Sequence, residues 1–280
     1  MAEFRAMWRV AVGALRETFS GIRPYFIAVV VLALMHLASS DVRALCSQYD
    51  VKASVLPLFI FVFNAIYYIL LFNFLFCVLA CDVPLRKGHQ RYIVLRCGRS
   101  VWAGGQILYL ILLATIFIVW LFIASMIVLA GKLSFSLDWG RVYFSLARIE
   151  LHGGVSFSNT IQSAFTAPQA FLISFGLQWL CFVLFGLIIY AINLATGRNI
   201  GMIVPCFFLL MYFHFAQYIV NGQWTTWISP VLLSRLMWHA YVRQPDMSYA
   251  IGFFLINIAA LMICCVALAR RRRGGIDMCH

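Results

Sequence analysis

The chain has 280 residues, of which 64% are hydrophobic and only 11% are charged, and its formal net charge is +12. Soluble globular domains carry about 25% charged residues, so this composition excludes an ordinary soluble protein. The basic residues lie in short blocks between apolar stretches, a distribution that indicates membrane topology and argues against nucleic-acid binding.

Residues 1–23 are predicted to form an amphipathic helix, because apolar side chains share one helical face and arginines share the neighbouring one. The apolar face holds Phe4, Trp8, Ala11, Leu15, Phe19 and Ile22, and the basic face holds Arg5, Arg9, Arg16 and Arg23. Such a helix lies in the membrane interface, with its apolar side chains in the acyl boundary and its arginines among anionic headgroups. We therefore expect it to contact membrane lipid.

Residues 24–269 are predicted to form an all-α, polytopic transmembrane domain of about six helices, because the apolar stretches are long enough to cross a hydrocarbon core of about 30 Å. The expected spans are residues 24–40, 55–81, 106–130, 169–194, 201–221 and 249–269. An even number of spans places both termini on one side. Most Lys and Arg residues then fall on that side, so the positive-inside rule predicts that both termini are cytoplasmic, with residues 270–280 as a basic tail.

Between the second and third expected spans, residues 82–105 form a cytoplasmic segment that is too long for a tight turn and mixes basic with apolar residues. One interpretation is a plain positive-inside loop. The other is a short helix beneath the membrane that docks a soluble partner. The residues of the segment leave both interpretations open.

Two longer segments, residues 131–168 and 222–248, are expected outside the membrane. The second contains residues 228–242, a stretch too short to span a bilayer and too apolar to be freely solvated, so we expect a re-entrant or interface-lying helix there. The chain has nine cysteines, most of them in or beside the expected spans, and Cys46 is the clearest one outside. They indicate no disulfide framework.

Motifs that would indicate chemistry are absent from the sequence. It has no G-x-x-x-x-G-K-[ST] loop for nucleotide phosphates, no H-E-x-x-H zinc motif and no G-x-S-x-G nucleophile elbow, and its six histidines are scattered. We therefore expect no catalytic residue, metal site or cofactor on this chain. Its acidic residues all fall in termini, loops or span edges, which argues against a carrier coupled to protons or sodium ions.

A few polar side chains are placed at membrane depth, where each can line a pathway or simply join two helices by hydrogen bonds. The pathway candidates are His36, Asn64, Gln178, His214, Gln217 and Asn221. The best-ordered set is the stripe of His214, Gln217 and Asn221, which share one helical face. Asn64 and Asn73, by contrast, point to opposite faces of their expected helix.

In its architecture the chain resembles the permease subunits of type-2 ABC exporters, a family that includes bacterial peptide, antibiotic and multidrug exporters. The resemblance rests on the amphipathic N-terminal helix, the cytoplasmic segment at residues 82–105, and three short runs near span boundaries. These runs are Thr166-Ala-Pro-Gln-Ala-Phe before the fourth span, Asn193-Leu-Ala-Thr-Gly-Arg-Asn-Ile-Gly201 after it, and Ile228-Ser-Pro230 before the last.

The resemblance implies that residues 82–105 include a coupling helix that seats in a groove of an ATPase, and that residues 228–242 form an outer gate. The residues carried over as ATPase contacts are Arg86, Lys87, Gln90, Arg91, Arg96 and Arg99. It also implies a separate ATP-binding cassette ATPase that holds ATP and Mg²⁺, a second permease copy or paralogue, and a location in the bacterial cytoplasmic membrane. The substrate is then a peptide, antibiotic, lipid-like or other amphipathic molecule, exported by alternating access.

Two other functions fit the same composition. A membrane scaffold or assembly factor has no transport path, and an ion-coupled secondary carrier works without ATP. Substituting Arg91 and Arg96 by Glu separates the scaffold from the exporter, because only an exporter complex should lose ATPase activity. Transport in proteoliposomes driven by a proton gradient would instead indicate the carrier.

Overall fold

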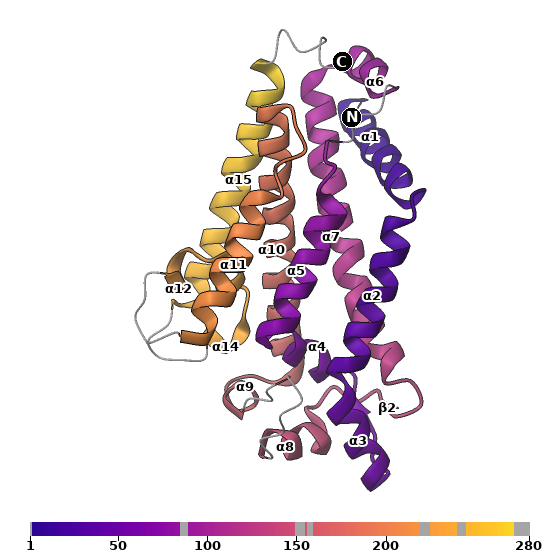
Figure 1. The fold of residues 1–280 in the computed structure, drawn as a ribbon, viewed down its shortest axis with the longest axis vertical. Coiled ribbons are helices and arrows are strands. Elements are labelled where there is room, and N and C mark those ends of the chain that lie inside the picture. Colours follow the sequence, from indigo (N-terminus) through magenta and orange to yellow (C-terminus); the bar gives the residue numbers. More distant parts are fainter. Residues whose placement is uncertain are drawn as a thin grey trace.

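The computed structural model describes most of the chain, namely residues 2–84, 89–148, 155, 159–218, 225–239 and 245–271. These residues are almost entirely helical, which confirms the all-α class (Figure 1). The only strands among them are β1 (Ala53–Ser54) and β2 (Leu133–Ser134), which pair in parallel with Ala53 opposite Leu133. The longer helices run along the long axis of the molecule and form a bundle.

Three helices are long and apolar enough to cross a membrane: α7 (Arg99–Val128), α10 (Ala167–Thr196) and α15 (Met247–Arg271). A fourth candidate is the pair α1 (Ala2–Phe19) and α2 (Arg23–Ala38), which is bent by 69° at a short break. By length and composition, the described part of the chain therefore contains three candidate spans, or four with the bent pair, where the sequence predicted about six.

Two of the expected spans correspond to shorter apolar helices, α5 (Ile66–Ala80) and α11 (Ile203–Tyr218). At a rise of 1.5 Å per residue they are only about 22 Å and 24 Å long, less than a hydrocarbon core of about 30 Å. A further difference concerns α7, which begins at Arg99 and not at the expected residue 106. Residues 99–105, predicted to belong to the cytoplasmic segment, are therefore the first two turns of α7.

The expected span at residues 55–81 is not one helix, because α4 (Pro57–Val62) precedes α5 and the chain turns between them. Pro57 starts α4 at a position where its missing N–H is not needed. At the turn, the Asn64 side chain donates to the carbonyl oxygen of Ile60 at 2.7 Å. The Asn64 side-chain oxygen also accepts the backbone N–H of Met237 at 2.8 Å, which holds this turn against a distant segment of the chain.

The first helix packs along the start of α7 at unusually close range. A Cβ atom added to Gly105 would lie 2.6 Å from Val10 Cβ, so only glycine permits this approach. Ala11 is fully buried on the same helix, whereas Phe4 and Trp8 stay 63% and 46% exposed. The predicted interfacial helix is thus also a packing partner of α7, and its position in the membrane interface stays a prediction.

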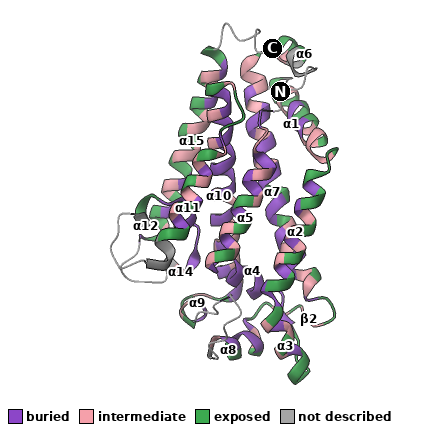
Figure 2. Cartoon of the chain, in the orientation of Figure 1, coloured by how far each residue is buried: buried purple, intermediate pink, exposed green. Residues whose placement is uncertain are grey.

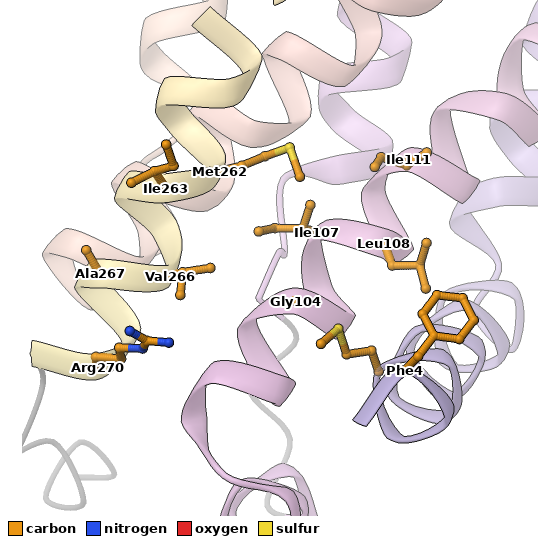
Figure 3. A pocket seen from close by; sticks show the side chains of 11 residues that line it. Phe4, Gly104, Ile107, Leu108, Ile111, Met262, Ile263, Val266, Ala267 and Arg270 are labelled. Atoms are coloured by element: carbon orange, nitrogen blue, oxygen red, sulfur yellow. The ribbon is translucent and has the colours of Figure 1, made fainter. Parts of the chain in front are cut away.

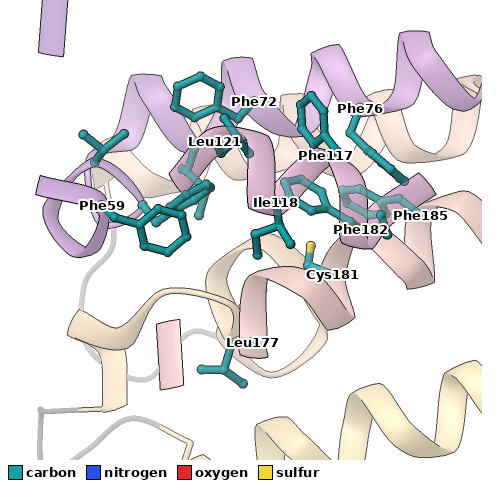
Figure 4. Packing of buried hydrophobic residues seen from close by; sticks show 14 of the residues in the cluster. Phe59, Phe72, Phe76, Phe117, Ile118, Leu121, Leu177, Cys181, Phe182 and Phe185 are labelled. Carbon is teal, nitrogen blue, oxygen red and sulfur yellow. The ribbon is translucent and has the colours of Figure 1, made fainter. Parts of the chain in front are cut away.

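Aromatic side chains fill the space between α4, α5, α7 and α10 (Figure 4). The ring of Phe59, on α4, lies with its centroid 5.9 Å from that of Phe122. Further along the bundle, the Phe182 ring packs 4.9 Å from Phe76 and 5.2 Å from Phe117. Each such pair contributes about 0.5–1.5 kcal/mol beyond the burial of its area. Burial is concentrated along α4, α5, α7 and α10, while the outer faces of α2 and α15 are exposed (Figure 2).

One end of the bundle is covered by short elements, and we call it the capped end (Figure 1). Its elements are α3 (Ser40–Tyr49), β1, β2, α8 (Gly140–Arg148) and α9 (Asn159–Ala164). Residues 131–168, expected as an outer loop, therefore contain a strand and two helices within their described part. These elements are amphipathic rather than long, which is why a search for apolar stretches passes over them.

Two aromatic residues anchor the cap to the bundle. Trp139 donates its indole N–H to the carbonyl oxygen of Phe165 at 3.0 Å, and its ring lies 5.8 Å from that of Phe61. The Tyr143 ring stacks on the Phe61 ring, with the two centroids 6.2 Å apart. The Tyr143 hydroxyl donates to the carbonyl oxygen of Ser54 at 3.4 Å. Both side chains are buried, so the cap has a small core of its own.

The opposite end holds the start of α1, α6 (His89–Cys97), the start of α7 and the end of α15, and we call it the terminal end (Figure 1). The start of the first described helix and the end of the last one thus lie at the same end of the bundle. Which end faces the cytoplasm stays a prediction from the positive-inside rule.

The stretch at residues 228–242 was expected to be one re-entrant or interface-lying helix. Its described part instead begins at the last residue of α12 (Thr225–Ile228) and contains two short helices, α13 (Pro230–Leu233) and α14 (Leu236–His239). Residues 229–236 are buried without interruption, because the segment packs into the bundle between these turns. Pro230 begins α13 and prevents a continuous helix through this region.

Candidate functional site

A buried amide at the terminal end ties three chain segments together. Asn193, in the last turn of α10, donates from its side-chain nitrogen to the carbonyl oxygens of Cys81 at 3.0 Å and Val83 at 2.6 Å. Its side-chain oxygen accepts the backbone N–H of Gly201 at 2.6 Å. Asn193 is fully buried, so these bonds form away from water, where they are strongest. One side chain thereby fixes the residues after α5 and those before α11 against α10.

The helix α2 reaches the same place through an ion pair. Arg23 Nη1 lies 2.5 Å from Asp82 Oδ2 and 3.3 Å from Cys81 Sγ. Both charged side chains are nearly half exposed, so the pair contributes about 0–1 kcal/mol to stability. Its main effect is positional, because it joins the start of α2 to the residues that Asn193 holds. We call Arg23, residues 81–83, Asn193 and Gly201 the junction.

Gly201 is required by close packing inside the junction. A Cβ atom at this position would lie 2.4 Å from the carbonyl oxygen of Ile189 and 2.8 Å from Asn193 Oδ1. The first neighbour is backbone and the second belongs to a side chain held by three hydrogen bonds, so a larger residue must push the backbone apart. The run from Asn193 to Gly201, which carried part of the family resemblance, is thus a turn closed by internal hydrogen bonds, including the one from the Gly201 N–H to the Asn193 side chain.

Four of the six predicted ATPase contacts have no described side chain. Arg86 and Lys87 lie outside the described residues, and Gln90 and Arg91 lie on α6, where only the backbone is described. Their role as contacts stays a prediction. Their place in the chain is nevertheless informative, because all four lie between the junction and the end of α6.

The described part of α6 presents a mixed apolar and basic surface. Tyr92 and Leu95 are 73% and 75% exposed, and at a spacing of three residues they share one helical face. Arg96 is exposed beside them. At Gly98, whose φ is 80°, the chain turns sharply into α7, of which the partly exposed Arg99 is the first residue. Because α6 contacts both α1 and α7, its outer face is the one left uncovered. We call Tyr92, Leu95, Arg96 and Arg99 the α6 surface.

A second polar cluster surrounds the break between α4 and α5. Arg235 donates from Nη2 to the carbonyl oxygen of Asn64, and the Asn64 side-chain oxygen accepts the backbone N–H of Met237 at 2.8 Å. The Arg235 guanidinium also lies 6.0 Å from the centroid of the Tyr212 ring. We call these residues the buried arginine cluster. It attaches the segment of short helices to the bundle.

The burial of Arg235 was not predicted. It lies in the segment expected outside the membrane, and only 5% of its surface is exposed. The physical reason is the apolar run around it, because Val231, Leu232, Leu233 and Leu236 are all buried and carry the arginine inward. A carbonyl oxygen and an aromatic face then offset part of the cost of removing the charge from water.

A third cluster lies in the middle of the bundle and joins α5 to α10. Gln178 donates from Nε2 to Asn73 Oδ1 at 3.1 Å, and Cys181 Sγ lies 3.5 Å from the same oxygen. Asn73 in turn donates to the carbonyl oxygen of Ile69 at 2.7 Å. All of these side chains are fully buried. The arrangement favours a role in holding two helices together over a role in lining an open path.

The pathway candidates do not come together where their side chains are described. Asn64 and Gln178 are buried in separate clusters, whereas His36 on α2 and His214 on α11 are exposed. For Gln217 only the backbone of α11 is described, and Asn221 lies outside the described residues. The expected stripe on the fifth span therefore stays a prediction. Asn64 and Asn73 bond to different partners, because Asn64 lies at the turn before α5 whereas Asn73 lies within α5.

The described residues contain free thiols but no cluster of metal-binding side chains. Among them, no three His, Cys, Asp or Glu side chains lie close enough to hold a metal ion. The eight cysteines in this part of the chain are all free thiols. Burial raises the pKa of the Cys46 thiol, an effect that the positive charge of Lys132 only partly offsets. A buried thiol with a raised pKa is a poor nucleophile, so Cys46 is structural.

No protein-family model matches the chain, and no curated protein matches it significantly. The resemblance to exporter permeases therefore rests on the chain's own residues, and the function drawn from it is stated below as a proposal.

Sequence reasoning missed several residues that organise these clusters. Asn73, Asn193 and Arg235 were not among the site candidates, and neither was Gln106, which is fully buried in α7 without a hydrogen-bond partner among the described residues. One signal was available: a polar side chain inside an apolar stretch needs a partner. The sequence did not reveal which distant segment supplies that partner.

Proposed function

We propose that this chain is the transmembrane permease subunit of an ATP-driven exporter. The observation that carries the proposal is the α6 surface: exposed apolar and basic side chains on a short helix at the terminal end, directly after the junction. Exposed apolar residues grouped with basic ones are typical of a protein-binding surface. A soluble ATPase that seats on this surface would bind this chain at a point connected to most of its long helices.

The junction supports the proposal because it can transmit displacement. A movement of α6 acts on α7 across the turn at Gly98. It also acts on residues 81–83, which Asn193 holds against α10 and the start of α11, and which Arg23 joins to α2. Bundles and packed interfaces respond to such shifts by switching between discrete arrangements. Closure of a partner ATPase would therefore move several helices together.

The proposal includes six spans with both termini in the cytoplasm. They are α2, α4 with α5, α7, α10, α11 and α15. The short helices α5 and α11 reach across the bilayer only with help from neighbouring segments, and α4 extends α5 by a second, offset turn of helix. The terminal end is then cytoplasmic, because most of the basic residues lie on that side. The chain resides in the bacterial cytoplasmic membrane in this proposal.

The packed interior supports a second permease copy or paralogue. Phenylalanine rings fill the region between α4, α5, α7 and α10, so a path for a peptide-like, antibiotic or lipid-like molecule has to form between two chains. A partner ATPase would bind the ATP and Mg²⁺. The same packing is also what favours the second candidate function, a scaffold or assembly factor that carries no substrate.

Affinity purification separates these functions. We expect a tagged chain, solubilised from its own membranes, to bring down an ATP-binding cassette subunit and to show ATP hydrolysis. Replacing Tyr92 by Ser together with Leu95 by Glu should remove at least about nine-tenths of the bound ATPase, as loss of central apolar contacts does at other interfaces.

The control variant is Phe135→Ser, because Phe135 is 79% exposed at the capped end and equally apolar. It should retain the ATPase. If the wild-type chain purifies with no ATP-binding protein, the exporter proposal is wrong. If it purifies with other proteins that the α6 variant also loses, the scaffold function is the correct one.

A further inference from the structure

An apolar groove of about 540 Å³ opens at the terminal end between α1, α7 and α15 (Figure 3). Ile107 and Ile111 of α7 line one wall, Met262 and Val266 of α15 line the other, and Phe4 of α1 contributes to the remaining side. Two of these helices are candidate membrane spans, so the groove lies on a surface that faces lipid in the proposed topology. A volume of this size accommodates a small-molecule ligand.

The groove has one charged residue in its lining, and this residue stands at its mouth. Arg270, near the end of α15, donates from Nε to Ser100 Oγ in the first turn of α7 at 2.9 Å. Among the described lining residues none is acidic. Arg271 follows Arg270 in the sequence but is not part of the lining.

The start of α7 adds to this positive potential. The residue before it is Gly98, and no side chain caps the helix there. The first N–H groups of a long helix carry a partial positive charge that favours an anion. Arg270 and the helix start thus act on the same place, with Ser100 between them.

The dimensions fit a molecule with an anionic head and an apolar tail. From Arg270 to Met262 the wall runs along eight residues of α15, which is about 12 Å from the charged mouth into the apolar part. The same direction on α7 leads from Ser100 past Ile107 to Ile111. The groove therefore runs from a charged mouth to an apolar part, as a phospholipid runs from its charged headgroup to its acyl chains.

We propose that this groove binds an anionic phospholipid, with the phosphate at Arg270 and one acyl chain lying between α7 and α15. Basic pockets between transmembrane helices recognise anionic headgroups in this way. The charged mouth is the reason to prefer a lipid over a second copy of the chain, whose contacting surface would have to bring an acidic group to Arg270. This inference stands apart from the transport function and holds whether or not the chain binds an ATPase.

Native mass spectrometry of the purified chain in detergent tests the proposal. We add phosphatidylglycerol or phosphatidylcholine with identical acyl chains and measure the fraction of protein that retains lipid. Phosphatidylglycerol should be retained at about fivefold lower concentration, the factor expected for one basic residue beside an anionic headgroup. Arg270→Gln should remove this preference, whereas Arg271→Gln, the same change one residue outside the lining, should keep it.

A second pair of variants tests the apolar part of the groove. Ala267 lines the groove and is exposed, so Ala267→Trp should fill it and reduce retention of both lipids. Ala259→Trp places the same side chain at an exposed position of α15 outside the lining and should leave retention unchanged. Gel filtration of each variant confirms that it is folded.

Three results would overturn the proposal. The first is equal retention of the two lipids by the wild-type chain, and the second is an equal loss in Arg270→Gln and Arg271→Gln. The third is a dimer that forms in place of the lipid complex and is broken by Ala267→Trp, since the occupant of the groove would then be a second copy.

Discussion

The two ends of the bundle differ in how the chain covers their apolar residues. At the capped end, Trp139 and Tyr143 are buried against Phe61, and short helices of the same chain cover the surface. At the terminal end, Tyr92 and Leu95 project from α6 and are largely exposed among the described residues. Both ends expose some apolar residues, Phe135 among them at the capped end, but the capped end also has a small core of its own residues.

The two ends also differ in what holds them together. Aromatic packing and several side-chain hydrogen bonds secure the cap, among them those of Trp139 and Tyr143. A fully buried amide, Asn193, secures the terminal end by bonding three backbone groups from distant segments. Packing tolerates small shifts, but a hydrogen-bonded turn has one geometry that satisfies all its groups. The hydrogen bonds of Asn193 therefore keep these segments of the terminal end in fixed positions relative to one another.

Asn193→Leu should produce the largest effect at either end. Leucine has the same branching as asparagine, but it cannot hydrogen-bond to the Cys81 and Val83 carbonyl oxygens or to the Gly201 N–H. Each lost bond costs about 1–3 kcal/mol, so we expect the free energy of unfolding in detergent to fall by about 3 kcal/mol or more.

The matched control is Asn257→Leu on α15. The Asn257 side chain makes one local bond, to the carbonyl oxygen of Phe253 at 2.7 Å, and this residue is only partly buried. We expect a loss below about 1 kcal/mol. Equal losses in the two variants would mean that the junction is not a special point of attachment.

Gly201→Ala should have the next largest effect. The added methyl group would collide with the carbonyl oxygen of Ile189, and overpacking of this kind costs about 1–3 kcal/mol. Gly176→Ala is the control on α10, because no atom lies within 4 Å of the position that its Cβ would occupy. There the substitution should raise stability by up to about 1 kcal/mol, since alanine is the better helix former. Thermal unfolding of both variants in one detergent measures the difference in sign.

Trp139→Phe should have the smallest effect of the three and should weaken only the capped end. It removes the hydrogen bond to the Phe165 carbonyl oxygen but keeps an aromatic ring against Phe61, so we expect a loss of about 1–2 kcal/mol. Trp8→Phe, at an exposed position of α1, should change stability by less than about 0.5 kcal/mol. Hydrogen exchange would locate the change, and protection lost in α6 instead of α8 would contradict the separation of the two ends.

The sequence predicted the long helices well because their signal is local. Expected spans and observed helices agree within two residues at both ends of α10 and α15, where the apolar stretch is unbroken. The break at Asn64 was missed because its cause lies elsewhere: the side chain that interrupts the helix bonds to Met237, far along the chain. A hydropathy profile carries no information about that long-range contact.

The clusters were harder to predict than the helices for the same reason. Asn193 stood out as a polar residue in an apolar stretch, but its partners at residues 81–83 are about 110 positions away in the sequence. The burial of Arg235 depends on Asn64 and Tyr212, which lie far from it in the sequence. The elements of the cap were passed over because their amphipathic pattern is short and lies between longer apolar signals.

The outermost helix has a consequence for how the protein is made. Only 11% of the most apolar part of α15 is buried inside the chain, against 61% for α10, and its buried residues are Ala250, Phe254, Cys265 and Ala269. Nearly all of the aromatic core precedes it in the sequence. When the ribosome reaches α15, the other helices of this core have already been synthesised. The last helix then packs onto helices that have already been made, and most of its surface stays exposed.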